Sequence, residues 1–210
     1  MLSDKSFESD RIVLGLLNSV GQGLTSQRRI AAELGVALGL VNAYLKRCVT
    51  KGLVKVSEAP ARRYAYYLTP RGFSEKTRLT VEYLSSSFSY FRHAKADCAL
   101  VFEAAKARNF RNLVLFGESD LAEIAILSAV ESGVSILAVV DEHSTLRSFA
   151  GKPVVNRVGD FPGNFDAVVV TSLRNASGLF EQAVGLYGAH RVFAPALLGL
   201  GTFRQEDGSR

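Results

Sequence analysis

Apolar residues in the first half of the chain recur at helical spacing and stop at glycines. Four of them precede Gly21 and predict a first helix that begins near an acidic segment at residue 10; they are Leu14, Leu16, Leu17 and Val20. Residues 26–34 predict a short second helix that ends at Gly35. Thr25 or Ser26 supplies the hydroxyl that caps this helix.

A third helix and a hairpin follow. The helix is expected to run from the turn at residues 35–37 to about Lys51, with Leu45 on its inward stripe. The rest of this stripe is Leu40 or Val41, and Cys48 or Val49. Residues 53–56 and 63–68 favour strands and are separated by a polar, basic segment, which predicts a hairpin. Helices joined by a tight turn and followed by a basic hairpin are typical of a winged helix-turn-helix.

A long helix is expected next. Thr69 supplies a capping hydroxyl and Pro70 fits the first helical position, so the helix should begin here and last to about Asn109. Within it a stripe repeats at steps of three and four residues: Leu84, Phe88, Phe91, Lys95, Cys98, Phe102 and Ala105. Such a stripe is either intramolecular core or the seam of a dimer.

The second half of the chain alternates short apolar runs with helical patterns. The runs are residues 112–116, 134–140 and 165–170, and the helical patterns are residues 120–132 and 174–187. Buried parallel strands that alternate with helices fit this order, so we predict an α/β protein with a Rossmann-like domain after the winged helix-turn-helix. The expected divisions are a DNA-binding domain at 1–80, a helical dimerisation linker at 81–110, and a ligand-binding or dimerisation domain at 111–210.

Charge separates the two halves as well. Residues 1–110 hold 17 Lys and Arg against 9 Asp and Glu, and residues 111–210 hold 8 against 11, so the net charges are +8 and −3. This asymmetry indicates that only the first half meets a polyanion, with double-stranded DNA as the expected partner. The chain has no apolar run of about 18 residues and no apolar signal core, and Cys48 and Cys98 are isolated. We therefore expect a cytoplasmic protein with reduced thiols.

The winged layout assigns roles to polar residues of the first half. The third helix is expected to enter the major groove, where Asn42 can bind adenine and Gly39 lets the helix lie close to the duplex. Cations at the start of the second helix and at the hairpin tip are expected to reach phosphates or a minor groove. The predicted DNA-binding residues are Arg28, Arg29, Gly39, Asn42, Lys46, Arg47, Arg62 and Arg63.

The most distinctive part of the first half is Tyr-Ala-Tyr-Tyr-Leu-Thr-Pro-Arg-Gly at 64–72, followed by Glu-Lys-Thr-Arg-Leu-Thr at 75–80. With the helices before it, this part of the chain resembles the MarR-type winged-helix regulators that are associated with exopolysaccharide gene clusters. The resemblance covers about the first 95 residues. It implies transcriptional control, with polysaccharide production as the pathway, although those regulators usually stop where this chain continues.

A glycine turn follows the first predicted strand of the second half, where a dinucleotide-binding fold has its phosphate loop. Serine and alanine stand in place of that loop's second and third glycines, and two acids add negative charge there. Asp141 ends the next predicted strand, 24 residues after Gly117, where an acid commonly binds a ribose. The candidate ligand-binding residues are Gly117, Glu118, Ser119, Asp120, Asp141, Thr171 and Ser172. A nucleotide or nucleotide-sugar site remains open, as does a structural domain or one that binds an uncharged ligand or a protein.

Four segments of the second half carry a further resemblance: Phe116-Gly117 with Leu121-Ala122, Ala138 to Asp141, Phe149 to Val154 and Phe165 to Ser172. Residues 111–195 are similar to the N-terminal Rossmann-like domain of sugar acyltransferases of the PglD type, which implies a nucleotide-linked sugar as ligand. The order of a winged helix and a Rossmann domain is also similar to the redox-sensing repressor Rex, which implies NAD(H). The sequence itself assigns no cofactor.

Nothing in the sequence predicts a catalytic or metal-binding residue. The three histidines, His93, His143 and His190, are scattered, and no Cys/His set has metal-ligand spacing. We expect a homodimeric, sequence-specific transcriptional regulator of polysaccharide biosynthesis genes whose second domain senses a nucleotide-sugar or a related small molecule. The alternatives are a NAD(H)-responsive repressor and a nucleotide-sugar-modifying enzyme with a DNA-binding module.

Overall fold

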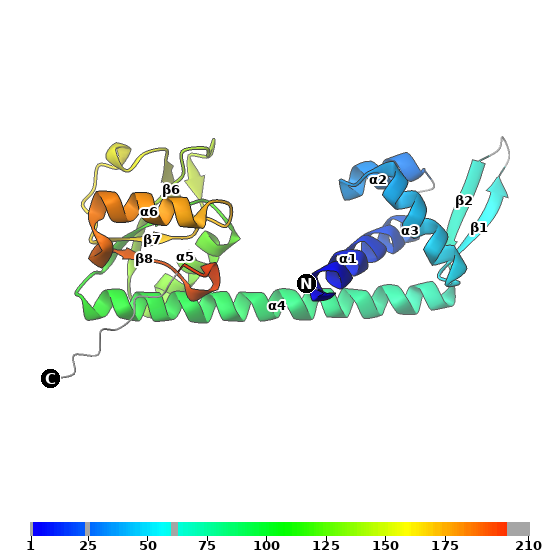
Figure 1. Ribbon diagram of the computed structural model, residues 1–210, viewed down its shortest axis with the longest axis horizontal. Coiled ribbons are helices and arrows are strands. Elements are labelled where there is room, and N and C mark those ends of the chain that lie inside the picture. Colours follow the sequence, from blue (N-terminus) through cyan, green and yellow to red (C-terminus); the bar gives the residue numbers. More distant parts are fainter. Residues whose placement is uncertain (1, 24–25, 60–62, 201–210) are drawn as a thin grey trace. The chain divides into compact units, whose positions relative to one another are not determined.

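The computed structural model describes residues 2–23, 26–59 and 63–200, with side chains at 9–23, 26–57 and 64–200 (Figure 1). The chain forms two compact units that divide within one long helix, at Phe88 and Ser89. We call residues 1–88 the winged unit and residues 89–210 the sheet unit. Within the described residues, no helix is long and apolar enough to cross a membrane.

The winged unit is the predicted winged helix-turn-helix. Its elements are α1 (Leu2–Gly21), α2 (Gln27–Leu34), α3 (Leu38–Thr50), β1 (Val54–Ala59), β2 (Arg63–Leu68) and the start of α4 (Pro70–Ala107). The strands pair antiparallel, from Val54 opposite Leu68 to Ala59 opposite Arg63. α1 begins earlier than the expected position near residue 10, because residues 2–9 carry no apolar stripe from which periodicity could find the helix.

The core of the winged unit decides which face of α3 points inward. Val41, Leu45 and Cys48 are buried against a cluster that includes Leu16, Leu17 and Ile30, whereas Leu40 and Val49 are exposed. The two alternatives at each end of the predicted stripe are therefore resolved in favour of Val41 and Cys48. Gly35 ends α2 with a φ of +63°, a conformation that glycine adopts without steric cost.

The start of α4 is bonded to the base of the hairpin. Thr69 Oγ1 donates a hydrogen bond to Gly52 O at 2.7 Å and accepts one from Gly72 N at 3.0 Å. A Cβ on residue 72 would lie 2.0 Å from Leu53 O, so only glycine allows this approach of α4 to the chain that enters β1. Thr69 and Gly72 of the Thr-Pro-Arg-Gly sequence are thus explained by contacts within the unit.

The sheet unit contains the predicted parallel sheet. Its elements are the end of α4, β3 (Asn112–Phe116), α5 (Asp120–Ser132), β4 (Ser135–Val140), β5 (Ser148–Phe149), β6 (Lys152–Val155), β7 (Ala167–Val170), α6 (Ala176–Tyr187) and β8 (Val192–Phe193), with 3-10 turns at Val158–Asp160, Ala189–Arg191 and Ala196–Leu198. The strand order is β5-β6-β4-β3-β7-β8, and only the β5–β6 pair is antiparallel. If the five parallel strands are numbered along the chain, their order is 3-2-1-4-5, as in a Rossmann fold.

Alternate residues of the central strands pack on opposite faces of this sheet. Leu113, Leu115 and Val169 belong to one core cluster, which also contains buried side chains of α4 and α5. Val114 and Val168 belong to another cluster, which contains side chains of α6. Both faces are covered, so the strands read as nearly continuous apolar runs in the sequence.

The apolar stripe of α4 divides into a buried and an exposed part. Cys98, Phe102 and Ala105 are fully buried in the sheet unit. Three earlier members are exposed, at 45% for Leu84, 59% for Phe88 and 39% for Phe91. The pattern left open whether the stripe is intramolecular core or the seam of a dimer. The second part of the stripe is intramolecular core. Cys48 and Cys98 are free, buried thiols, as predicted.

Candidate nucleic-acid interface and ligand cleft

The outer face of α3 presents polar groups to solvent. Gly39, Lys46 and Arg47 are exposed and Asn42 is half-buried, on the helix whose inward face is fixed by the core. Because Gly39, Asn42 and Lys46 are spaced by three and four residues, they share one face of the helix. An added Cβ on residue 39 would meet nothing within 4 Å, so this glycine leaves the surface open to an approaching molecule.

Cations on α2 extend this polar surface. Arg28 and Arg29 are exposed on the first turn of α2. Gln27 Nε2 donates a hydrogen bond to the hydroxyl of Tyr66 at 2.7 Å, which ties the start of α2 to β2. Ser26 precedes the helix, but its side chain makes no capping hydrogen bond, and Thr25 lies outside the described residues.

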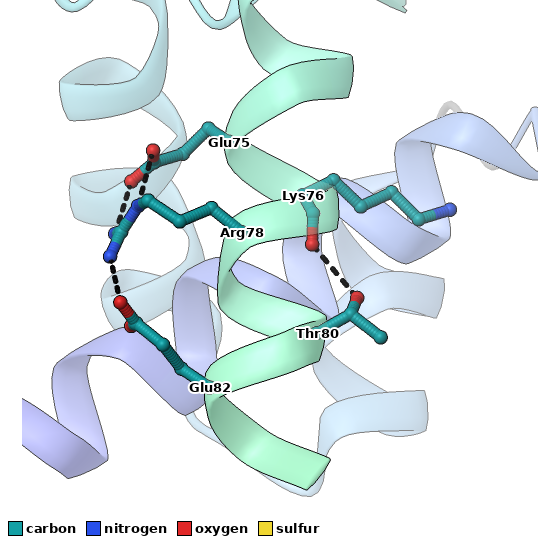
Figure 2. Close-up of polar contacts among 5 residues, drawn as sticks. All are labelled: Glu75, Lys76, Arg78, Thr80 and Glu82. Atoms are coloured by element: carbon teal, nitrogen blue, oxygen red, sulfur yellow. Dashed lines mark hydrogen bonds and ion pairs between the residues drawn. The ribbon is translucent and has the colours of Figure 1, made fainter. Parts of the chain in front are cut away.

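The pairing of these cations differs from that of another arginine in the same unit. None of Arg28, Arg29, Lys46 and Arg47 has a side-chain hydrogen bond or ion pair with a residue that the structure describes. Arg78 on α4, by contrast, lies 2.7 Å from a carboxylate oxygen of Glu75 and 2.5 Å from one of Glu82, as Figure 2 shows. The charge of Arg78 is neutralised on the protein, whereas the α2 and α3 charges are available to a partner.

The hairpin tip contains the last two predicted DNA-binding residues. Arg62 lies outside the described residues, and Arg63 is the first residue of β2 with its side chain outside them. Their contact with DNA stays a prediction.

In the sheet unit, the predicted phosphate loop is hydrogen-bonded to the neighbouring strand end. Gly117 follows β3 with a φ of +101°, and a Cβ there would lie 2.4 Å from the Cβ of Ser172. Thr171 Oγ1 donates to Gly117 O at 2.7 Å, and Ser119 Oγ donates to Thr171 O, also at 2.7 Å. Ser119 Oγ in turn accepts from Ala122 N at 3.2 Å and caps α5. The point between β3 and β7 where the strand order reverses is thus held together by the protein's own bonds.

Two of the three acids of this region, Asp141 and Glu118, also have hydrogen-bond partners within the chain. The carboxylate of Asp141 accepts hydrogen bonds from Glu118 N at 2.9 Å and from His143 N at 3.0 Å. The hydroxyl of Ser144 donates to the carboxylate of Glu118. Asp120 is exposed at the first residue of α5. Asp141, the predicted ribose ligand, therefore fixes two turns at the carboxyl edge of the sheet.

A cleft of about 640 Å³ lies beside this hydrogen-bonded region. Of the predicted ligand residues, Glu118, Asp141 and Ser172 line it, whereas Gly117, Ser119, Asp120 and Thr171 do not. Lining residues that the sequence reading missed include Asn156, Arg157, Arg174, Leu179 and Tyr187. Arg157 and Arg174 follow the carboxyl ends of β6 and β7. The position of Arg157 would have indicated it had residues 152–155 been recognised as a strand, whereas Arg174 was assigned to the helical pattern 174–187 although α6 begins at Ala176.

The described residues contain no group of three or more His, Cys, Asp or Glu that could hold a metal ion. The polar lining of the cleft instead includes acids, amides, hydroxyl groups, one histidine and two arginines. Such groups can bind and orient a ligand through hydrogen bonds and charge.

Comparison with known proteins identifies one part of the chain. Residues 8–55 match a family model described as winged helix-turn-helix DNA-binding, which covers α2, α3 and most of α1. No curated protein matches the chain.

Several solved structures are similar to the chain at low identity. A transcription regulator of the MarR family is 24% identical with a TM-score of 0.34; the match covers 39% of this chain and 54% of that one, so the chain spans about half of its length. An O-methyltransferase from neocarzinostatin biosynthesis, in complex with S-adenosyl-L-homocysteine, is 14% identical over 91% of this chain and 83% of that one, with a TM-score of 0.40. Human N-acetylserotonin methyltransferase in complex with SAM is 11% identical over 80% and 68%, with a TM-score of 0.28.

With TM-scores below 0.5, these structures carry no conclusion about function here. The family model and the element order of the winged unit agree independently of them. Together they show that the chain contains a winged helix-turn-helix of the DNA-binding kind, followed by a sheet domain with mostly parallel strands.

Proposed function

We propose that the protein is a sequence-specific transcriptional regulator that inserts α3 into the major groove of DNA. The observation that carries this proposal is the outer face of α3, where Gly39, Asn42 and Lys46 are accessible on the helix that a winged helix-turn-helix places in the groove. The family match of residues 8–55 supports the same role.

The residues of this surface are proposed to make two kinds of contact with DNA, one to base edges and one to phosphates. Asn42 has the amide that pairs bidentately with adenine, and an open position at Gly39 lets the helix approach the base edges. The cations without a described partner, Lys46, Arg47, Arg28 and Arg29, are available to neutralise phosphates, which position a protein on DNA without reading its sequence. Affinity is then expected to fall as salt rises, because each phosphate contact releases counterions.

A homodimer is the proposed functional form. Val81, Leu84, Phe88 and Phe91 are exposed and continue the three-and-four spacing of the buried part of α4. Exposed apolar surfaces of this kind mark interaction sites. We infer that a second copy covers these residues and presents a second α3 to a palindromic half-site.

The sheet unit is proposed to sense a small molecule. Polysaccharide genes as targets, and a nucleotide-sugar or related compound as effector, are suggested by the sequence resemblances. Ligand binding at the carboxyl edge of the sheet would act on DNA affinity through α4, which contributes residues to both units. A ligand that prefers one arrangement by about 1–3 kcal/mol would change DNA affinity roughly 5- to 150-fold.

The proposal is tested by measuring the salt dependence of DNA binding. Fluorescence anisotropy with a labelled duplex between about 50 and 200 mM salt gives the slope of log affinity against log salt. Replacing Lys46 and Arg47 together with glutamine should reduce the magnitude of this slope by roughly 0.9 for each phosphate that the protein no longer neutralises.

Arg78→Gln is the matched control, because Arg78 is exposed in the same unit but already paired with Glu75 and Glu82. Its slope should equal that of the unmodified protein. A protein that does not bind duplex DNA, or an Arg78 variant that changes the slope as much as the Lys46 and Arg47 variant, would exclude this interface.

A further inference from the structure

The cleft of the sheet unit has a chemistry that the glycine turn does not suggest. We propose that it binds a small organic anion, whose carboxylate or phosphate is held by Arg157 and Arg174 and whose apolar part lies against α6. This inference rests on the proposed function, since it gives the chemical class of the effector. It differs from the sequence prediction by moving the anion away from the glycine turn.

The cleft has the position and size of a small-molecule site. Its volume of about 640 Å³ lies within the range of about 300–1,000 Å³ that such sites occupy. Phe116 and Val140, the last residues of β3 and β4, contribute to its lining, together with the segments 141–146 and 156–159. Ligands of open parallel sheets bind outside this carboxyl edge.

Two arginines line the cleft from loops that follow different strands. Arg157 follows β6 and Arg174 follows β7, and β4 and β3 lie between these two strands in the sheet. Among the residues that the structure describes, neither arginine has a hydrogen-bond or ion-pair partner. Arg191 is different: its guanidinium donates to the carbonyls of Asp166 and Phe165 at 2.6 and 2.7 Å.

Two of the three acids of the cleft, Asp141 and Glu118, are hydrogen-bonded within the protein. Asp141 accepts two backbone hydrogen bonds, Glu118 accepts one from Ser144, and Glu142 lies 3.4 Å from the ring nitrogen of His143. Arg157 and Arg174 are therefore cationic groups of the lining that lack a hydrogen-bond or ion-pair partner within the described part of the chain, although the acids outnumber them. A guanidinium matches carboxylate and phosphate oxygens in a bidentate geometry.

The remaining lining supplies an apolar surface. Leu179, Leu186 and Tyr187 line the cleft from α6, and Leu186 is 63% exposed. The ring of Tyr187 is held by edge contacts to Phe116 and Phe165, with centroids 6.2 and 5.4 Å apart. A ligand with an apolar or aromatic body would cover this surface, while a bare inorganic anion would leave it exposed.

The test uses two fluorescent probes that differ by one anionic group. These are 8-anilinonaphthalene-1-sulfonate and N-phenyl-1-naphthylamine, which lacks the sulfonate. In the full-length protein, Arg157→Gln and Arg174→Gln should each weaken binding of the sulfonate about tenfold or more and leave binding of the neutral probe unchanged. Arg147→Gln is the control, since Arg147 is exposed in the same unit and does not line the cleft. Unchanged sulfonate affinity in both cleft variants, or equal loss of both probes, would overturn the proposal.

Displacement of the bound sulfonate identifies the anion. Phenyl phosphate and benzoate represent the two chemistries, and benzyl alcohol represents the uncharged one. Displacement by either anion, abolished in the Arg157 variant, supports the site and names its class. If benzyl alcohol displaces the sulfonate as readily as both anions do, the proposed anion site is contradicted. It is also contradicted if none of the three compounds displaces the sulfonate.

DNA binding is measured on the same variants to separate the two proposals. Without a ligand, Arg157→Gln should bind duplex DNA with the salt slope of the unmodified protein. Anion binding in a protein that does not bind DNA would reject the proposed function and leave the site standing. A protein that binds DNA but does not discriminate the anionic probe would reject the anion site and leave the proposed function standing.

Discussion

The outer face of α3 and the junction between β3 and β7 were both expected to bind a partner, and they differ in what their polar groups already contact. Lys46 and Arg47 on α3 have no described partner in the chain. At the junction, Ser119 and Thr171 are hydrogen-bonded to each other's segments, and Gly117 packs on Ser172. Because buried polar groups must find partners, a junction that satisfies itself has little left to offer a ligand. The availability of a polar group, more than its type, distinguishes the two surfaces.

A similar difference occurs along α4. Phe102 and Phe88 occupy equivalent positions of one stripe, but the first is fully buried by the sheet unit and the second is 59% exposed. A repeat in the sequence cannot tell which of its members have an intramolecular partner. The exposed members require a partner outside the chain, and the buried ones do not.

The buried thiols Cys48 and Cys98 lie one in each unit, so their labelling rates compare how often the two units open to solvent. Burial raises the pKa of Cys48, and it raises the pKa of Cys98 to about 12, so both stay as unreactive neutral thiols. Labelling with a thiol reagent should be at least about 10³-fold slower in the native protein than in denaturant, since it requires opening of each unit. Mass spectrometry of the labelled peptides reports the two sites separately. Fast labelling of Cys48 alone would show that the winged unit opens independently.

Replacing the two phenylalanines separates the buried from the exposed part of α4. Phe102→Ala should lower the free energy of unfolding by about 3–5 kcal/mol, because it empties a fully buried site. Phe88→Ala should change it by less than about 0.5 kcal/mol in dilute protein and weaken self-association instead. Urea denaturation and sedimentation velocity measure the two effects. An unmodified protein that stays monomeric at every concentration would refute the dimer.

Replacing one glycine in each region by alanine compares the junction between β3 and β7 with the outer face of α3. Gly117→Ala should lower the free energy of unfolding by about 1–3 kcal/mol, because its Cβ would meet Ser172 and its φ is positive. Gly39→Ala should raise it by about 0.5–1 kcal/mol, since the site is helical and open, yet weaken DNA binding by blocking close approach. Thermal unfolding and anisotropy give both values. Equal DNA affinity with alanine at 39 would argue against contact at this residue.

The smallest expected effect concerns Asp166, at the amino edge of the sheet. Its carboxylate accepts hydrogen bonds from Asn112 N and Arg111 N, both at 2.8 Å, and these lower its pKa. A lowered pKa in the folded state stabilises the fold above the ordinary value of about 3.9, and this contribution disappears as the pH falls through the folded pKa. Asp166→Asn should therefore be less stable than the unmodified protein at pH 7 and nearly equal to it in strong acid. Urea midpoints at the two pH values test this, and a constant difference would contradict it.

Periodicity and turn residues were sufficient to predict most of the fold. The glycine at 35, the Thr-Pro start of α4 and the apolar runs of β3, β4 and β7 lie where the patterns placed them. The β5–β6 hairpin was missed, because Ser148–Phe149 and Lys152–Val155 are too short and too mixed in polarity to resemble strands. Two arginines of the cleft, Arg157 and Arg174, were missed for a related reason: a loop residue becomes part of a site only through the strand order, which no local pattern specifies.

The amino-acid sequence alone determined most of the helices and strands, the winged layout and the separation of a basic from an acidic half, because these depend on local propensity, spacing and charge. The tertiary structure decided which side chains of α3 face outward, which half of the α4 stripe is core and which polar groups near Gly117 are already bonded. Those outcomes depend on contacts between residues distant in sequence, such as Ser119 with Thr171 and Phe102 with the sheet. Burial and hydrogen-bond satisfaction are properties of such contacts, so only the folded chain shows them.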